Sequence, residues 1–138
     1  MQIKDNTILI TGGGSGIGRG LAEAFHKEGN HVIIAGRRKS VLDEVVAANP
    51  GMSAEVLDIG SAEAIKAFAD NLIEKYPKLN AVLHNAGIML NEKLVDGNAE
   101  DAEAMIATNL LGPIRLNSGL LPHLLQQPSA TVMTVTSG

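Results

Sequence analysis

The sequence predicts an α/β fold, a doubly wound parallel sheet with helices on both faces, over all 138 residues. Short β-branched, apolar runs alternate with longer amphipathic segments, which is the pattern of repeated βαβ units. A glycine-rich bend follows the first apolar run directly, and no linker, low-complexity tract or repeat divides the chain. Strands separated by helices of this length pair in parallel through right-handed crossovers, so we expect a single domain.

The expected elements follow these runs in chain order. The strands are Ile3 to Thr11, His31 to Ala35, Ser53 to Leu57, Ala81 to His84 and Thr131 to Thr136. The helices are Ile17 to Glu28, Val41 to Ala48, Ala62 to Lys75 and Glu100 to Gln126. Gly29-Asn30 ends the first helix, and Ser40 followed by Asp43 favours the start of the second. Asn49-Pro50-Gly51 then closes that second helix.

Composition excludes several classes of partner. The chain is 45% hydrophobic, enough for a core, and its formal charge of −4 gives no general attraction for nucleic acid or an anionic membrane. We expect neither partner, and no run reaches the ~18 apolar residues of a spanning helix. Met1 to Asp5 lacks a secretory signal, so a cytoplasmic location is expected. The absence of cysteine excludes disulfides and cysteine chemistry, and no metal site is expected.

A phosphate-binding loop is predicted directly after the first strand. Its sequence is Thr11-Gly12-Gly13-Gly14-Ser15-Gly16-Ile17-Gly18, with the spacing Thr-Gly-x-x-x-Gly-x-Gly. Glycines allow positive φ and close approach, and free N–H groups at a helix start attract anions. The candidate binding residues are Gly12, Gly14, Ser15, Gly16, Ile17 and Gly18. The alternative is a tight strand-to-helix turn that binds no ligand.

Three cations follow the second strand, in Gly36-Arg37-Arg38-Lys39. A fold that prefers NAD usually has an acid there for the adenosine ribose, and none is present. Cations near a helix start oppose the helix dipole, so an anionic ligand gives a reason for them, and the 2′-phosphate of NADP fits. Arg37 can grip phosphate through two N–H groups, while Arg38 can share it or stack on adenine. The alternatives are a solvated basic turn, or an NAD preference despite Arg37 and Arg38.

The glycine loop resembles that of the short-chain dehydrogenase/reductase family, and Asn85-Ala86-Gly87 after the fourth strand matches a second element of that family. The resemblance implies a Rossmann fold with strands in the order 3-2-1-4-5, lacking the later strands of a full family member. It also implies that the loop wraps the pyrophosphate of a nicotinamide cofactor. Asp58, with Ile59 beside it, would contact the adenine amine, although an aspartate after a strand is otherwise a common turn or helix cap.

The fourth strand and its Asn-Ala-Gly segment are expected to lie beside the cofactor. Small residues such as Ala86 and Gly87 let the backbone pass close to the ribose, and the Asn85 amide can tie neighbouring strands together. His84 stands where many relatives have asparagine, and we expect it to be a packed strand residue rather than a catalyst.

Asn109 matches the asparagine of the family's catalytic tetrad. Pro113 is four residues downstream and has no N–H, so it cannot bond the Asn109 carbonyl in the α-helical pattern. In the family this oxygen holds a water linked to the active-site lysine. The alternative is a kinked helix whose asparagine is satisfied locally.

Ser137, in Val135-Thr136-Ser137-Gly138, aligns with the family's active-site serine, which donates a hydrogen bond to a substrate carbonyl. The Tyr-x-x-x-Lys pair of the family should follow later, and the sequence ends at Gly138 without it. The only tyrosine, Tyr76, lies far from that place and is expected to be a packing residue. The residues given are therefore expected to be inactive alone.

The sequence thus predicts the cofactor-binding portion of an oxidoreductase that transfers hydride between NADP(H), in preference to NAD(H), and a small carbonyl or alcohol substrate. The segment Leu121-Pro122-His123-Leu124, with Pro128, resembles the DltE-type branch of the family. An apolar fifth strand left at a sheet edge invites pairing with another chain, and a homo-oligomer is expected. The alternative function is a non-catalytic dinucleotide-binding sensor or subunit.

Overall fold

The computed structural model describes residues 1–90 and 99–136. Five parallel strands form one sheet in the order β3-β2-β1-β4-β5, which confirms the predicted order and fold class. The strands are β1 (Thr7–Thr11), β2 (His31–Gly36), β3 (Ser53–Val56), β4 (Ala81–His84) and β5 (Thr131–Thr134). Strand β1 is central and buried along its whole length, as a parallel strand covered on both faces must be.

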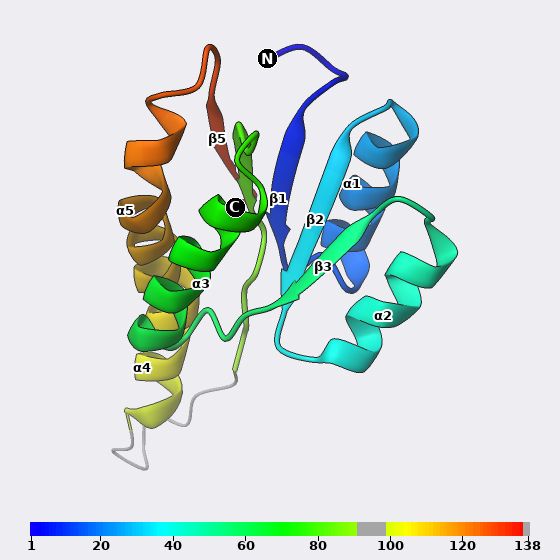
Figure 1. The fold of residues 1–138 in the computed structure, drawn as a ribbon. Helices are drawn as coiled ribbons and strands as arrows, with labels where there is room; N and C mark the ends of the chain where they lie inside the picture. The colour runs from blue at the N-terminus through cyan, green and yellow to red at the C-terminus, as the bar shows by residue number, and fades with distance from the viewer. Residues whose placement is uncertain (91–98, 137–138) are drawn as a thin grey trace.

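Helices cover both faces of this sheet. They are α1 (Gly16–Lys27), α2 (Lys39–Ala48), α3 (Ala62–Lys75), α4 (Glu100–Ile106), the π-helical segment η2 (Ala107–Leu111) and α5 (Gly112–Leu124). Figure 1 shows α1 and α2 on one side of the sheet and α3, α4 and α5 on the other. Among the described helices, none has the length and apolarity required to cross a bilayer.

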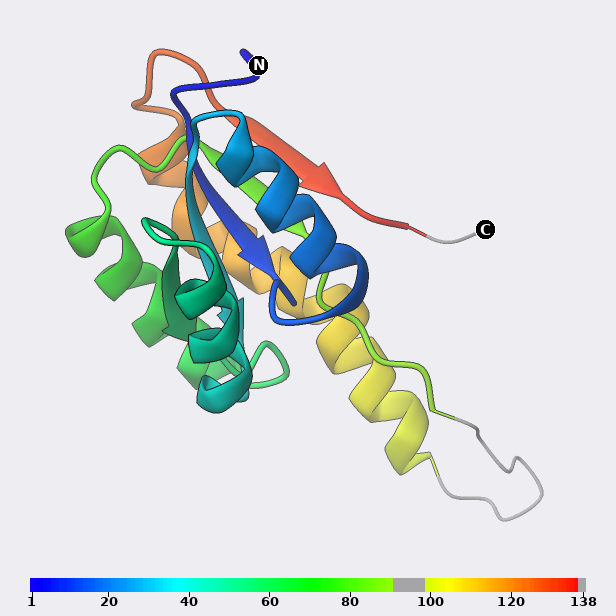
Figure 2. The same cartoon turned by 90° about the vertical axis from the view of Figure 1, so that its right-hand side faces the viewer.

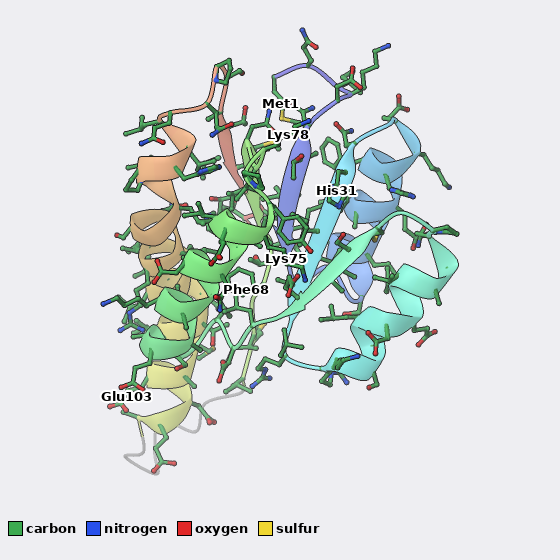
Figure 3. All side chains as sticks on the ribbon, viewed as in Figure 1. Met1, His31, Phe68, Lys75, Lys78 and Glu103 are labelled. Atoms are coloured by element: carbon green, nitrogen blue, oxygen red, sulfur yellow. The ribbon has the colours of Figure 1, made fainter. Side chains whose placement is uncertain are left out.

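Side chains that alternate along the strands divide the core into two layers. Ile8 and Ile10 of β1 pack in the layer beneath α1 and α2, while Leu9 packs in the layer beneath α3 and α5. Phe68 of α3 belongs to the second layer and lies between this helix and the sheet (Figure 3). Both layers meet at the central strand, which therefore fixes the positions of the loops at its carboxyl end.

Several predicted boundaries were wrong by a few residues. The first strand begins at Thr7, because Ile3 is exposed and Asp5 turns the chain with φ of +64° before the pairing of Thr7 with His31 begins. The second helix begins at Lys39, and Arg38 is its N-cap without a side-chain hydrogen bond. Ser40 therefore lies inside the helix and does not start it.

The other ends differ by smaller amounts. The third strand ends at Val56 and the fifth at Thr134, one and two residues earlier than expected. The first helix runs from Gly16 to Lys27, so both of its ends are shifted by one residue. These are positions where pairing or helical bonding fades while the apolar sequence pattern continues.

The long helix expected from Glu100 to Gln126 is interrupted by η2 and ends at Leu124. Figure 2 shows α4, η2 and α5 following one another as a single rod. The Gly112 N–H donates to the Ala107 carbonyl, five residues back, and Pro113 has no N–H to donate to Asn109. The proline therefore breaks the α-helical bonding pattern in the turn where the sequence placed Asn109.

Candidate functional site

A cavity of about 270 Å³ opens at the carboxyl ends of the strands, the lower end of the sheet in Figure 1. Its walls come from the loops after β1, β2, β3 and β4 and from η2. The lining residues are Thr11, Gly12, Gly14, Ser15, Ala35, Gly36, Arg37, Arg38, Val41, Leu42, Leu57, Asp58, Ile59, Ala86, Gly87, Ile88 and Thr108. Segments far apart in the sequence thus meet at the edge where parallel sheets bind ligands.

The glycine loop forms one end of the cavity. Gly12 has φ of +68° and Gly16 has φ of +54°, values that side chains other than glycine rarely adopt. Ser15 is the N-cap of α1, makes no side-chain capping bond, and no acid lies in the first turn. The first-turn N–H groups of α1 have no intrahelical acceptors, so this end of the cavity favours an anion.

Only part of the predicted loop lines the cavity. Gly12, Gly14 and Ser15 do, whereas Gly16, Ile17 and Gly18 do not. Ile17 is exposed on the outside, and Gly16 has open space around it and is required by its φ. Gly18 is buried, and a Cβ there would lie 2.1 Å from the Gly12 carbonyl oxygen and 2.3 Å from Asn85 Nδ2. Gly18 therefore packs the start of α1 against the loop and β4.

The segment after β4 is fastened to β1 by hydrogen bonds. The backbone N–H groups of Asn85 and Ala86 donate to Thr11 Oγ1 over 3.0 and 3.1 Å. Asn85 Nδ2 donates to the Gly12 carbonyl over 3.2 Å. Asn85 thus ties the two loops together, while Ala86 and Gly87 line the cavity. Sequence reasoning missed Thr11 as a functional residue, although it stands first in the loop pattern.

The basic turn supplies two unpaired guanidinium groups at the other end of the cavity. Arg37 and Arg38 are exposed and line the cavity, and neither makes an ion pair or a side-chain hydrogen bond within residues 1–90 and 99–136. Lys39 Nζ instead pairs with Asp43 Oδ2 over 2.6 Å. Two of the three cations are therefore free to hold an anion.

The cavity wall also includes apolar side chains. They are Leu57 and Ile59, which follow β3, and Val41 and Leu42 of α2. Asp58 also lines the cavity, and its Oδ1 accepts from the Gly60 N–H over 3.0 Å. This is the local turn that the sequence offered as the alternative, and it leaves Asp58 Oδ2 without a hydrogen bond to the described residues.

Asn109 does not line the cavity. Its Oδ1 accepts from the Ile88 N–H and its Nδ2 donates to the Ile88 carbonyl, both over 2.8 Å. The side chain thus holds the loop after β4 against η2, and its partner is 21 residues away in the chain, not in the helix as the alternative supposed. The preceding residue, Thr108, lines the cavity instead, and nothing in the sequence pattern singled it out. Ser137 lies outside the described residues.

Two further side chains were expected to be structural. His84 is buried and bonds Asn117 Oδ1 through Nε2 over 2.7 Å. Tyr76 packs against the core layer under α3, away from the cavity, and its hydroxyl donates to Glu55 Oε1 over 2.8 Å. Burial raises the pKa of Tyr76. Both expectations are confirmed.

Residues 6–138 match the family model of the short chain dehydrogenases. The chain is 36% identical to an uncharacterized oxidoreductase, DltE, of Bacillus subtilis (strain 168), covering 100% of this chain and 56% of that protein. It is 30% identical to the 3-oxoacyl-[acyl-carrier-protein] reductase FabG of Thermotoga maritima, covering 99% of this chain and 57% of FabG. The chain thus spans little more than half the length of these curated relatives.

Solved structures agree with the sequence comparison. A short chain dehydrogenase from Escherichia coli CFT073 complexed with NADPH superposes with a TM-score of 0.88 at 27% identity, covering 97% of this chain and 59% of that one. One from Shigella flexneri 2a str. 301 complexed with NADP superposes with a TM-score of 0.87 at 28% identity and the same coverage. Fold, loop spacing and family match coincide over almost every residue, and the chain therefore belongs to the short chain dehydrogenase family, with DltE-like oxidoreductases among its relatives.

Proposed function

We propose that residues 1–138 are the dinucleotide-binding domain of an NADP-dependent oxidoreductase that acts on a small carbonyl or alcohol substrate. One observation carries the proposal: a single cavity joins the open N-terminus of α1 to two unpaired guanidinium groups. The relatives complexed with NADP and NADPH support the same cofactor. When bound, the nicotinamide would supply or accept the hydride.

The residues present fit each part of NADP. Gly12, Gly14 and Ser15 would hold the pyrophosphate, because backbone N–H groups at a helix start attract anions. Asp58 and Ile59 would receive the adenine, the first by accepting a hydrogen bond and the second by apolar contact. A Cβ at Gly12 would lie 3.0 Å from the Ala86 Cα, so only glycine lets these two backbone segments pack closely and leaves the cavity open to the cofactor.

The preference for NADP over NAD is assigned to Arg37 and Arg38. A guanidinium forms two parallel N–H bonds to a phosphate, and the 2′-phosphate is the group that separates the two cofactors. The described wall near these arginines offers no carboxylate on the β2–α2 turn for a free ribose hydroxyl. NADH would therefore bind the same cavity without its strongest charged contacts.

Arg37→Ala tests this assignment. We expect the Kd for NADPH to rise by about tenfold or more, in line with the loss of a charge-assisted bond, while the Kd for NADH stays unchanged. Isothermal titration with both cofactors measures it, and Lys39→Ala is the matched control, since Lys39 is paired with Asp43. An unchanged NADPH affinity in Arg37→Ala contradicts the assignment.

The catalytic proposal extends to Asn109 and Ser137, with Ser137 donating to the substrate carbonyl. Tyr76 is the one tyrosine of the sequence, and it is held by Glu55 outside the cavity. Hydride transfer to a carbonyl requires a proton donor at the forming alkoxide. We therefore propose that residues 1–138 bind NADPH but reduce carbonyl compounds negligibly without a donor from outside these residues.

A second candidate is a non-catalytic dinucleotide-binding sensor or subunit. It would use the same cavity to bind the dinucleotide and would transfer no hydride. The two candidates share the cavity and differ in what the reading frame encodes beyond Gly138. A tyrosine followed four residues on by a lysine supports the enzyme, and a stop codon supports the sensor.

We also propose that the protein forms a homo-oligomer through the rod of α4, η2 and α5. Ile106, Leu110 and Ile114 recur every four residues along it and are 51%, 56% and 52% exposed. Residues at this spacing share one face of a helix, and a stripe of half-exposed apolar side chains is typical of a surface that another chain covers.

A further inference from the structure

The side chain of His84, the last residue of β4, is buried inside the protein. It is only 3% exposed, and its Nε2 lies 2.7 Å from Oδ1 of Asn117 on α5. An amide oxygen can only accept a hydrogen bond, so Nε2 is the nitrogen that carries the proton. Nδ1 is buried and has no hydrogen-bond partner in the part of the chain that the structure describes. The imidazole is therefore held neutral in one tautomer.

His84 lies next to segments that position the cavity. The His84 carbonyl accepts from the Val135 N–H over 2.9 Å, which fixes the segment after β5. The next residue, Asn85, holds the Gly12 carbonyl of the glycine loop. Asn117 lies on the same rod as Asn109, about two helical turns further along. One partly buried hydrogen bond thus links the end of β4 to the rod whose Asn109 holds Ile88.

Among the described residues, no charged group contributes to the pKa of the imidazole. Strands β1 and β5 on either side of β4 contain no titratable residue, and β4 contains none besides His84. On α5 the titratable side chains are Arg115 and His123, and neither contributes to the pKa of His84. Burial lowers that pKa, and the bond to Asn117 opposes the shift in part.

We propose that the His84–Asn117 pair is a pH-sensitive latch between β4 and α5, closed while the imidazole is neutral and opened by its protonation. A second proton would bind Nδ1, which would then be a buried donor without an acceptor among the described residues. The resulting positive charge would be stabilised only by the neutral amide of Asn117, so burying it would cost free energy. Acid therefore favours conformations in which His84 leaves its site and α5 separates from the end of β4.

The direction of the pH dependence follows from proton binding. An unfolded chain has a histidine pKa of about 6.5, and the folded value is lower. Between these two values the unfolded state binds more protons, so stability falls as the pH drops below about 6.5. In this window the unfolding equilibrium constant should rise by up to about tenfold for each unit by which the pH falls. Above the window His84 is neutral in both states, and its contribution to stability is fully present.

Urea unfolding between pH 7.5 and pH 5 tests the latch in the wild-type chain and in His84→Asn, which keeps a polar group but cannot titrate. We expect the acid loss of stability to be smaller in His84→Asn than in the wild type. The control is His31→Gln, which removes an exposed histidine of β2, so that an effect common to the loss of any histidine appears in both variants. Equal slopes in the wild type and His84→Asn overturn the latch.

Nuclear magnetic resonance of the wild-type chain gives a second reading that does not depend on the variant folding. The latch requires the imidazole of His84 to be protonated on Nε2 at pH 7 and to titrate below pH 6.5. Titration at or above the ordinary histidine value overturns it.

A binding measurement tests whether the latch reaches the cavity, and this part rests on the proposed function. We expect the Kd for NADPH to rise several-fold more between pH 7 and pH 5.5 in the wild type than in His84→Asn, since titration of the cofactor phosphate is common to both. An identical rise in both proteins shows that the latch does not reach the cavity. If the stability arm succeeds and no dinucleotide binds at any pH, the proposed function fails while the latch stands.

Discussion

At the residue scale, several candidate side chains hold the protein's own backbone. Asn85 binds the Gly12 carbonyl, Asn109 binds both backbone groups of Ile88, and Asp58 closes a turn on Gly60. Each of these bonds fixes a loop that lines the cavity, so the amides and the carboxylate act on a ligand first through the backbone they position. Gly18 also positions a loop of the cavity, because the absence of a side chain lets the Gly12 carbonyl pack directly against it.

Gly18→Ala should therefore destabilise the fold and weaken NADPH binding together. The added methyl group meets the Gly12 carbonyl and the Asn85 amide, both of which are fixed, and we expect a loss of about 1–3 kcal/mol in the free energy of unfolding. Urea unfolding and NADPH titration measure the two effects.

Gly20→Ala is the matched control on the same helix. Its new Cβ meets nothing within 4 Å, and alanine favours the helix, so stability should rise by about 0.5–1 kcal/mol with unchanged NADPH affinity. If Gly18→Ala also gained stability, the close approach of α1 to the loop would be refuted.

At the scale of elements, close helix packing sets where the rod of α4, η2 and α5 lies. At Gly112 a Cβ would be 2.7 Å from the Ile59 carbonyl oxygen, so the rod touches the loop after β3 next to the cavity. At Gly119 a Cβ would be 2.7 Å from the Ala69 Cβ, so the Ala69 methyl group of α3 packs directly against the backbone of α5. Small residues at these two points bring η2 close to the sheet, so that Thr108 lines the cavity and Asn109 reaches Ile88.

The contact of α5 with α3 can be measured by a double-mutant cycle. Gly119→Ala should lose about 1–3 kcal/mol from overpacking, in spite of the better helix propensity of alanine. Ala69→Gly makes room for the new methyl group, so the double variant should be more stable than the sum of the two single changes predicts. Additive effects in urea unfolding would show that the helices do not meet at this point.

At the scale of the whole molecule, apolar side chains remain exposed at the surface. In the part of the chain that the structure describes, β3 and β5 each pair with a single strand, and Val132 of β5 is 43% exposed. The rod adds its own stripe of half-exposed apolar side chains, Ile106, Leu110 and Ile114, of which Ile114 is the last. A surface of this kind is commonly buried in an oligomer. Burial of an edge strand in the oligomer also prevents it from pairing with other chains and aggregating.

Ile114→Glu should shift the protein towards monomers, because each copy would bring a charge into the apolar contact. Light scattering after size-exclusion chromatography measures the mass, and Ala67→Glu, on the exposed face of α3, is a control with the same change in charge. A wild type that stays monomeric, or an Ile114→Glu variant of unchanged mass, contradicts the oligomer.

The alternation of strands and helices, the parallel pairing and the loop after β1 are determined by the sequence alone, because they depend on periodicity, glycine conformation and chain connection. The tertiary structure decided which loop residues face the cavity and which pack: Gly14 and Gly18 look alike in sequence, yet only the first lines it. It also decided the roles of Thr108, whose direction depends on a π-helical turn, and of His84, whose burial depends on α5. Such roles arise from contacts between residues that are distant in the chain, and a local sequence pattern does not predict those contacts.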